Sequence, residues 1–140
     1  MAAFLNVFFF VFHSLWMLFN SVGWAWKRTR PWHLLTVGVT AFSWIFFAWW
    51  YGYDWGYCLC TDWHWQARAQ LGYPHDPSYT HLLILSVTGM DVAPWLADTL
   101  TVGIFAIVAV LSILLNGRDF RRWRQRKARA AVTPGPSTNH

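Results

Sequence analysis

The chain has 140 residues, of which 56% are apolar and 20% aromatic, including 12 tryptophans. Only 12% of the residues are charged, about half of the share found in soluble domains. A soluble core of this size cannot hide so much apolar surface, so the composition excludes a soluble globular domain and favours a membrane protein. The net charge is +5, and the basic residues flank apolar segments. This placement indicates that they orient the chain in a membrane and argues against nucleic-acid binding.

The charges are segregated along the chain. One basic cluster contains Lys27, Arg28 and Arg30, and a second occupies residues 118–129. Five of the six acidic residues lie between the two clusters: Asp54, Asp62, Asp76, Asp91 and Asp98. This alternation predicts that the basic clusters share one side of a membrane and that the acids face the other.

Two charge-free segments open the chain. The first predicts a span over about residues 3–26, and the second a span over 31–53, since about 20 apolar residues cross a hydrocarbon core. Pro31 suits a first helical turn, and tryptophan and tyrosine gather at the ends of the second segment, where aromatic rings settle at membrane interfaces. The first segment lacks the positive start and the cleavage site of a signal peptide.

The middle of the chain, residues 54–93, predicts a loop on the far side of the membrane. Residues 63–71 predict a short helix. The apolar stretch 81–90 is too short to span and predicts an interfacial or re-entrant helix. Asp91 is a candidate helix N-cap for a third span over residues 94–116, with Gly117 as its C-cap.

The chain then continues as a basic helical extension over residues 117–130, expected to lie on the membrane surface. Residues 131–140 predict a disordered tail. The sequence therefore predicts a single all-α integral membrane domain over 1–130, with three transmembrane helices, one short helix and an exoplasmic loop. The positive-inside rule makes both basic clusters cytoplasmic and the N-terminus and loop exoplasmic.

Polar residues within the predicted spans fall on single helical faces, following the helical period. Because polar groups in lipid are expensive, these faces are expected to turn toward one another inside the bundle. Interhelical packing is the simplest role for them, through hydrogen bonds of order 1 kcal/mol. The residues of this inward stripe are Asn20, His33, Thr36, Thr40, Ser43, Thr101 and Ser112.

The loop carries the densest set of reactive side chains. Cys58, Cys60, Asp62 and His64 occupy alternate positions, so an extended chain would point all four the same way. Thiolate, carboxylate and imidazole are ligands for zinc, copper or iron, so Cys58, Cys60 and His64 are metal candidates. A labile redox pair and two inert buried thiols are the rival interpretations.

Two further ionisable residues lie inside predicted spans, and such residues are functional candidates by default. They are His13 and Asp98. They complete a candidate ligand or redox cluster with the four loop residues.

No nucleophile–base pair, phosphate-binding loop or dinucleotide motif is present, which argues against an enzyme. We expect an accessory or binding subunit of a larger membrane assembly, in contact with the bilayer and with other subunits or copies of itself. The alternative is a membrane redox protein, or one that binds a metal or haem, through the Cys, Asp and His residues of the exoplasmic loop. A small transporter or lipid-binding protein ranks third.

Several short motifs occur in a characteristic order along the chain. They are Phe12-His13, Phe19 to Trp24, Thr29-Arg30, His33-Leu34, Ser43-Trp44, Tyr57-Cys58, Thr61 to Gln66, Leu71 to Tyr73, Ser78-Tyr79 and Thr88-Gly89. Over about residues 8–116 the chain thereby resembles the domain of unknown function 2784, a family of small bacterial inner-membrane proteins. The resemblance implies a compact helical fold in a bacterial inner membrane and implies no activity.

Overall fold

The computed structural model describes residues 1–52, 56–76 and 78–132, and every regular element among them is a helix. The helices are α1 (Ala2–Val22), α2 (Arg30–Tyr51), α3 (Leu59–Ala69), α4 (Tyr79–Thr88) and α5 (Pro94–Val132). Asp54 and residues 133–140 of the predicted tail lie outside the described residues, whereas residues 131 and 132 belong to α5. The prediction of an all-helical chain is confirmed.

Three of the helices, α1, α2 and α5, are long and apolar enough to cross a membrane. Most of their large apolar side chains are exposed, as at Phe42 (69%) and Ile113 (60%), and few side chains are fully buried. Exposed apolar surface on that scale marks an interaction with lipid or protein in a folded chain. The structure is therefore compatible with the three predicted spans.

Local sequence explains where the helices begin and end. Pro31 lies in the first turn of α2 and Pro94 begins α5, positions where a missing N–H costs nothing. The helix α2 ends at Gly52, whose φ of 68° is left-handed and favours glycine. Ser78 caps α4, because its side chain accepts a hydrogen bond from the backbone N–H of His81.

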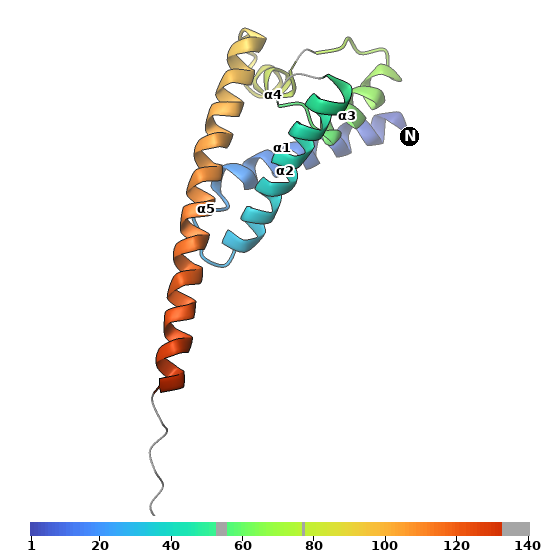
Figure 1. Ribbon diagram of the computed structural model, residues 1–140. Helices are drawn as coiled ribbons and strands as arrows, with labels where there is room; N and C mark the ends of the chain where they lie inside the picture. The colour runs from blue at the N-terminus through green and yellow to red at the C-terminus, as the bar shows by residue number, and fades with distance from the viewer. Residues whose placement is uncertain (53–55, 77, 133–140) are drawn as a thin grey trace, which may run out of the picture.

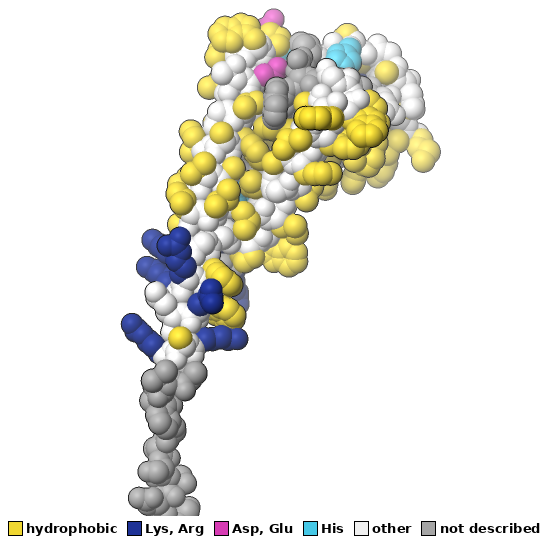
Figure 2. Space-filling view, viewed as in Figure 1, with side chains coloured by type: hydrophobic (Ala, Val, Ile, Leu, Met, Phe, Trp, Pro, Cys, Tyr) yellow, Lys and Arg dark blue, Asp and Glu magenta, His cyan; other side chains and the backbone are white. Residues whose placement is uncertain are grey.

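The helices form an open arrangement (Figure 1). The longest helix, α5, packs along α2, and α1 runs obliquely to both. The short α3 packs mainly on α1, while α4 packs on α5. Figure 2 shows dark blue lysine and arginine side chains gathered on the C-terminal half of α5, with acidic side chains at the opposite end of the molecule.

Three local predictions are wrong. The loop helix begins at Leu59 rather than residue 63, so the Cys58 to His64 segment is not extended and its alternate residues do not share a face. Asp91 does not cap α5, because it binds His81 instead. Gly117 does not end α5, since the helix continues to Val132. The basic extension is helical, as predicted, and continues α5 without a break.

Candidate functional site

A cavity of about 560 Å³ lies between α1, α2 and α5, and the first residues of α3 form part of its wall. Ligand pockets in proteins have volumes of roughly 300–1,000 Å³. Most of the lining is apolar: Phe12, Trp16, Met17, Val39, Phe42, Trp44, Phe46, Phe47, Tyr51, Leu59, Ile104, Phe105 and Val108. The polar or thiol lining consists of His13, Asn20, Ser21, Thr40, Ser43, Cys58, Cys60 and Thr101.

The cavity opens sideways between α1 and α2. Phe12 of α1 and both Phe42 and Phe46 of α2 line it, yet their exposed fractions are 39%, 69% and 39%. Deeper inside, the indole N–H of Trp16 donates to Thr40 at 2.9 Å and ties the two helices together. An elongated apolar molecule therefore has access from the side of the bundle.

His13 and Cys58 meet at this cavity. The Cys58 sulfur lies 3.5 Å from Nε2 of His13 and 3.3 Å from the Thr61 hydroxyl. The chain reaches this position because α3 packs along α1 and because the Leu59 N–H donates to Ser43 at 3.3 Å. The Tyr79 ring stacks on the His13 imidazole with centroids 3.9 Å apart and fixes its plane.

Both cysteines are free thiols, and their pKa values are shifted in opposite directions. The neighbouring Cys60 thiol lowers the pKa of Cys58 well below its usual value, against the effect of burial, and His13 and Thr61 add to the lowering. The pKa of Cys60 is raised, because its thiol donates to Cys58 and is itself partly buried. Cys58 is therefore the more acidic thiol of the pair, and Cys60 is the less acidic one.

One atom of His13 has no partner among the described residues. Only 6% of His13 is exposed, and its Nδ1 is buried without a hydrogen bond. A buried polar atom left unpaired costs about 1–3 kcal/mol, so such atoms in native proteins call for an explanation. Since His13 lines the cavity, a polar group of a bound molecule is a natural partner.

The other members of the candidate cluster do not join this pair. His64 donates through Nε2 to the amide oxygen of Asn6 at 2.9 Å, since that oxygen can only accept. Asp62 accepts from Gln66 at 2.7 Å, and Asp98 accepts from Ser78 at 2.5 Å. Among residues 1–52, 56–76 and 78–132, no three His, Cys, Asp or Glu side chains gather as a metal site requires.

The predicted inward polar stripe divides into two groups. The cavity is lined by Asn20, Thr40, Ser43 and Thr101, and its lining does not include His33, Thr36 or Ser112. Nε2 of His33 lies 2.8 Å from the Asn20 carbonyl oxygen, which only accepts, so Nε2 carries the proton. Nδ1 of His33 therefore accepts from Ser112 at 2.9 Å, and Thr36 donates to the Asn20 side chain at 3.1 Å. Both His33 and Ser112 are fully buried, and their hydrogen bonds join α1, α2 and α5.

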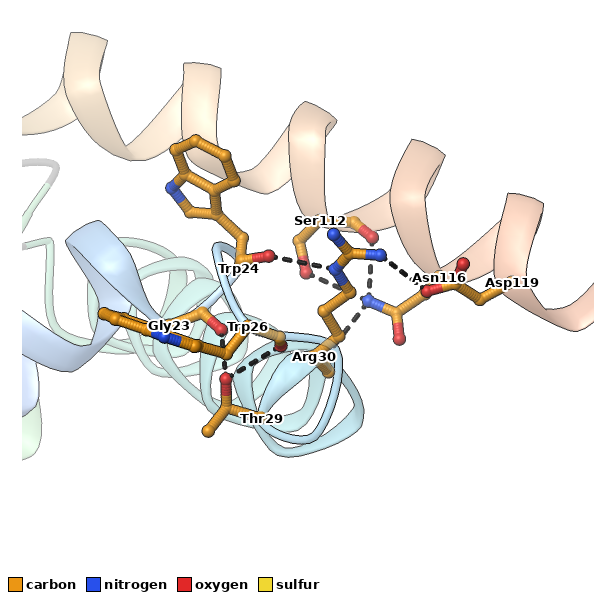
Figure 3. A network of polar contacts seen from close by, with 8 residues as sticks. All are labelled: Gly23, Trp24, Trp26, Thr29, Arg30, Ser112, Asn116 and Asp119. Atoms are coloured by element: carbon orange, nitrogen blue, oxygen red, sulfur yellow. Dashed lines mark hydrogen bonds and ion pairs between the residues drawn. The ribbon is translucent and has the colours of Figure 1, made fainter.

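An ion pair closes the basic end of the bundle (Figure 3). Arg30 contacts Asp119 at 2.7 Å and donates through Nε to the Trp24 carbonyl at 3.0 Å. Asn116 donates to the Arg30 carbonyl at 3.2 Å, and Thr29 donates to the Gly23 carbonyl at 2.6 Å. The turn between α1 and α2 is thereby tied to α5, and the two basic clusters lie at the same end of the molecule.

Sequence reasoning missed a second charged group at the other end. His81 contacts Asp76 through Nδ1 and Asp91 through Nε2, each at 2.9 Å. Two carboxylates require two donors, so the imidazole carries both protons. In the sequence, His81 comes five residues after Asp76 and ten residues before Asp91. This spacing predicts a contact only when it is known that α4 brings the histidine between the two aspartates.

Comparison with known proteins gives one match. The family model described as "Protein of Unknown function (DUF2784)" matches residues 3–117. No curated protein and no solved structure matches the chain. The match covers every residue that lines the cavity, His13 and Cys58 included. The resemblance first noted in the ordered motifs is thus confirmed, and the chain belongs to the DUF2784 family of proteins of unknown function.

Proposed function

We propose that the chain is a multi-pass membrane protein that binds the apolar chain of a lipid in the cavity between α1, α2 and α5. The observation that carries this proposal is the cavity itself, about 560 Å³ in volume, apolar in lining and open at the side. An opening between exposed phenylalanines would face the bilayer core, where hydrocarbon chains are the molecules at hand. Aqueous substrates would have to leave water to reach it.

Membrane insertion is supported by the three long apolar helices and their exposed side chains. We infer a bacterial inner membrane with the Arg30–Asp119 end in the cytoplasm, because basic residues near span ends favour that side. The N-terminus and α3 would then be exoplasmic.

The orientation has a direct test in a background that carries Cys58→Ser and Cys60→Ser. A membrane-impermeant maleimide should label Gln70→Cys in intact spheroplasts, since Gln70 is exposed at the end of α3. Arg126→Cys, exposed near the end of α5, should be labelled only after permeabilisation. The reverse pattern would overturn the orientation.

Lipid binding is tested by native mass spectrometry of the full chain released from mild detergent. After reconstitution with phosphatidylethanolamine and phosphatidylglycerol, the wild-type chain should retain one lipid molecule. Val108→Trp places a large ring in the cavity and should lose that lipid. Val110→Trp is the matched control, because Val110 lies on the same helix with 56% of its surface exposed.

A wild-type chain that retains no lipid, or a Val108→Trp chain that retains as much as wild type, would contradict the proposal. Thermal unfolding of both variants checks that they fold, because overpacking costs about 1–3 kcal/mol. We also propose a wider role for the chain, as a binding subunit of a membrane assembly. The same spectra test this role, because they report whether the chain is bound to another subunit or to a second copy of itself.

A further inference from the structure

Cys58 and His13 have the geometry of a nucleophile with its base. The sulfur and Nε2 are 3.5 Å apart, a distance at which a thiol can hydrogen-bond to an imidazole nitrogen. Activated nucleophiles are recognised by a base within reach whose ring is itself held in place. Here the stacked Tyr79 ring, 3.9 Å away between centroids, holds the imidazole.

The pair faces a space of a particular shape and chemistry. Both residues line the apolar cavity, whose walls run along α1, α2 and α5 away from the sulfur. Phe47 and Tyr51 of α2 also belong to its apolar lining. A reactive thiol at one end of an apolar cavity fits a molecule with an electrophilic head and a long hydrocarbon chain.

The unpaired Nδ1 of His13 is the second observation that points to such a ligand. When Nε2 accepts the thiol proton, Nδ1 already carries a proton and is a donor without an acceptor. A carbonyl oxygen on the ligand would supply the acceptor. Stabilisation of that oxygen as charge develops on it is the usual contribution of a positioned donor to acyl transfer.

We propose that Cys58 is the nucleophile that takes up a fatty acyl group as a thioester, with the acyl chain held in the cavity. This rests on the proposed lipid-chain binding. His13 removes the proton from the Cys58 thiol while the sulfur bonds to the carbonyl carbon of the donor. The bond from that carbon to the leaving oxygen or sulfur breaks, and the leaving group departs with the proton from His13, so no electrons are gained or lost.

Cys60 does not compete for this role. Its pKa is raised while that of Cys58 is lowered, so Cys60 serves as a hydrogen-bond donor that favours the neighbouring thiolate. A disulfide between the two would use both thiols and would need an oxidant. Oxidation is therefore the rival outcome of the test.

The experiment uses the full chain in detergent micelles and two alkyne-tagged acyl donors. One arm supplies palmitoyl-coenzyme A, and the other supplies vesicles of phosphatidylethanolamine with a tagged acyl chain. The wild-type chain should gain one acyl group by intact mass, located on Cys58 by peptide mapping and removed by neutral hydroxylamine. The arm that labels identifies the donor as a soluble thioester or a phospholipid ester.

Three variants test the roles of individual residues. Cys58→Ser should take no label, whereas Cys60→Ser still takes it. His13→Gln should slow labelling roughly a hundredfold, and its rate should rise with pH toward the thiol range near about 8.5. Val108→Trp should block the palmitoyl donor yet still accept an octanoyl donor, and Val110→Trp should accept both.

The outcomes separate the two proposals. If the wild-type chain retains lipid in native spectra but takes no acyl group from either donor, the acylation proposal fails and lipid binding stands. Label on Cys60 or on lysines, or a Cys58–Cys60 disulfide as the sole product, also overturns it. If neither lipid nor acyl group is retained, both proposals fail.

Discussion

The Asp119 carboxylate lies 2.7 Å from the Arg30 guanidinium, so one ion pair joins the start of α2 to α5 across 89 residues of sequence. Asp119 is the acidic residue within the second basic cluster. The side chain of Arg30 is 11% exposed and that of Asp119 is 32% exposed, which places the pair at the edge of the bundle interior. It is the contact that fixes both basic clusters at one end.

Removal of the acid should therefore destabilise the bundle. We expect Asp119→Asn to lower the free energy of unfolding, because Arg30, whose side chain is only 11% exposed, is left without a charged partner. Thermal unfolding in detergent micelles measures the change. Arg122→Gln, at an exposed position of the same helix, is the control and should shift stability little. Equal effects from the two variants would show that the ion pair contributes nothing.

Gly23 gives a second stability prediction, because a methyl group there has no room. A Cβ at this position would lie 2.7 Å from the Phe19 carbonyl oxygen and 2.9 Å from the buried His33 ring. Gly23→Ala should cost about 1–3 kcal/mol through overpacking. Gly38→Ala is the control: no atom lies within 4 Å of the new Cβ, and alanine favours a helix interior. Comparable loss in both variants would contradict the close approach of the two helices.

His81 predicts a pH dependence of the α4 region. Asp91 and Asp76 raise its pKa, so the ion pairs contribute fully below the unfolded value of about 6.5 and are lost as pH rises through the folded value. Relative to the intrinsic exchange rate at each pH, hydrogen exchange over residues 78–91 should therefore quicken at alkaline pH. In His81→Gln that quickening should be absent, and its persistence would rule out His81 as the cause.

His64 predicts the opposite dependence. Burial, with smaller contributions from Arg68 and His13, lowers its pKa to about 4. Between about pH 6.5 and that value the unfolded chain takes up a proton that the folded chain refuses, so stability falls as pH falls. In His64→Gln the free energy of unfolding should depend less on pH in this window. In the control His75→Gln, at an exposed position, the free energy of unfolding should still fall as pH falls. A wild-type free energy of unfolding that does not change with pH would contradict the burial of a neutral imidazole.

The arrangement of the three long helices, with both basic clusters at one end, was predictable. It depends on the charge and hydropathy of individual residues, which the sequence shows directly. The positions of Arg30 and of residues 118–129 implied one shared end, and the Arg30–Asp119 contact places them there. Pro31 and Pro94 likewise located the starts of α2 and α5 to within one residue. Such features depend on local chemistry alone.

The site was only partly predictable, because it depends on how helices pack. His13 and Cys58 were both candidates, but their pairing follows from the packing of α3 along α1, which no spacing reveals. The alternate spacing wrongly predicted one shared face for Cys58, Cys60, Asp62 and His64. That face would need an extended chain, whereas these residues lie at the start of a helix. The cavity had no local signal at all, since it arises from the oblique course of α1.

The unbroken course of α5 has a mechanical consequence. At about 1.5 Å per residue its 39 residues extend to about 58 Å, nearly twice a hydrocarbon core. Phe105 and Val108 line the cavity about a third of the way along this helix, Asp119 contacts Arg30 about two thirds of the way along, and Arg129 lies near its C-terminal end. A given change in the tilt of this helix about the cavity would therefore displace its basic C-terminal end further than the residues beside the cavity.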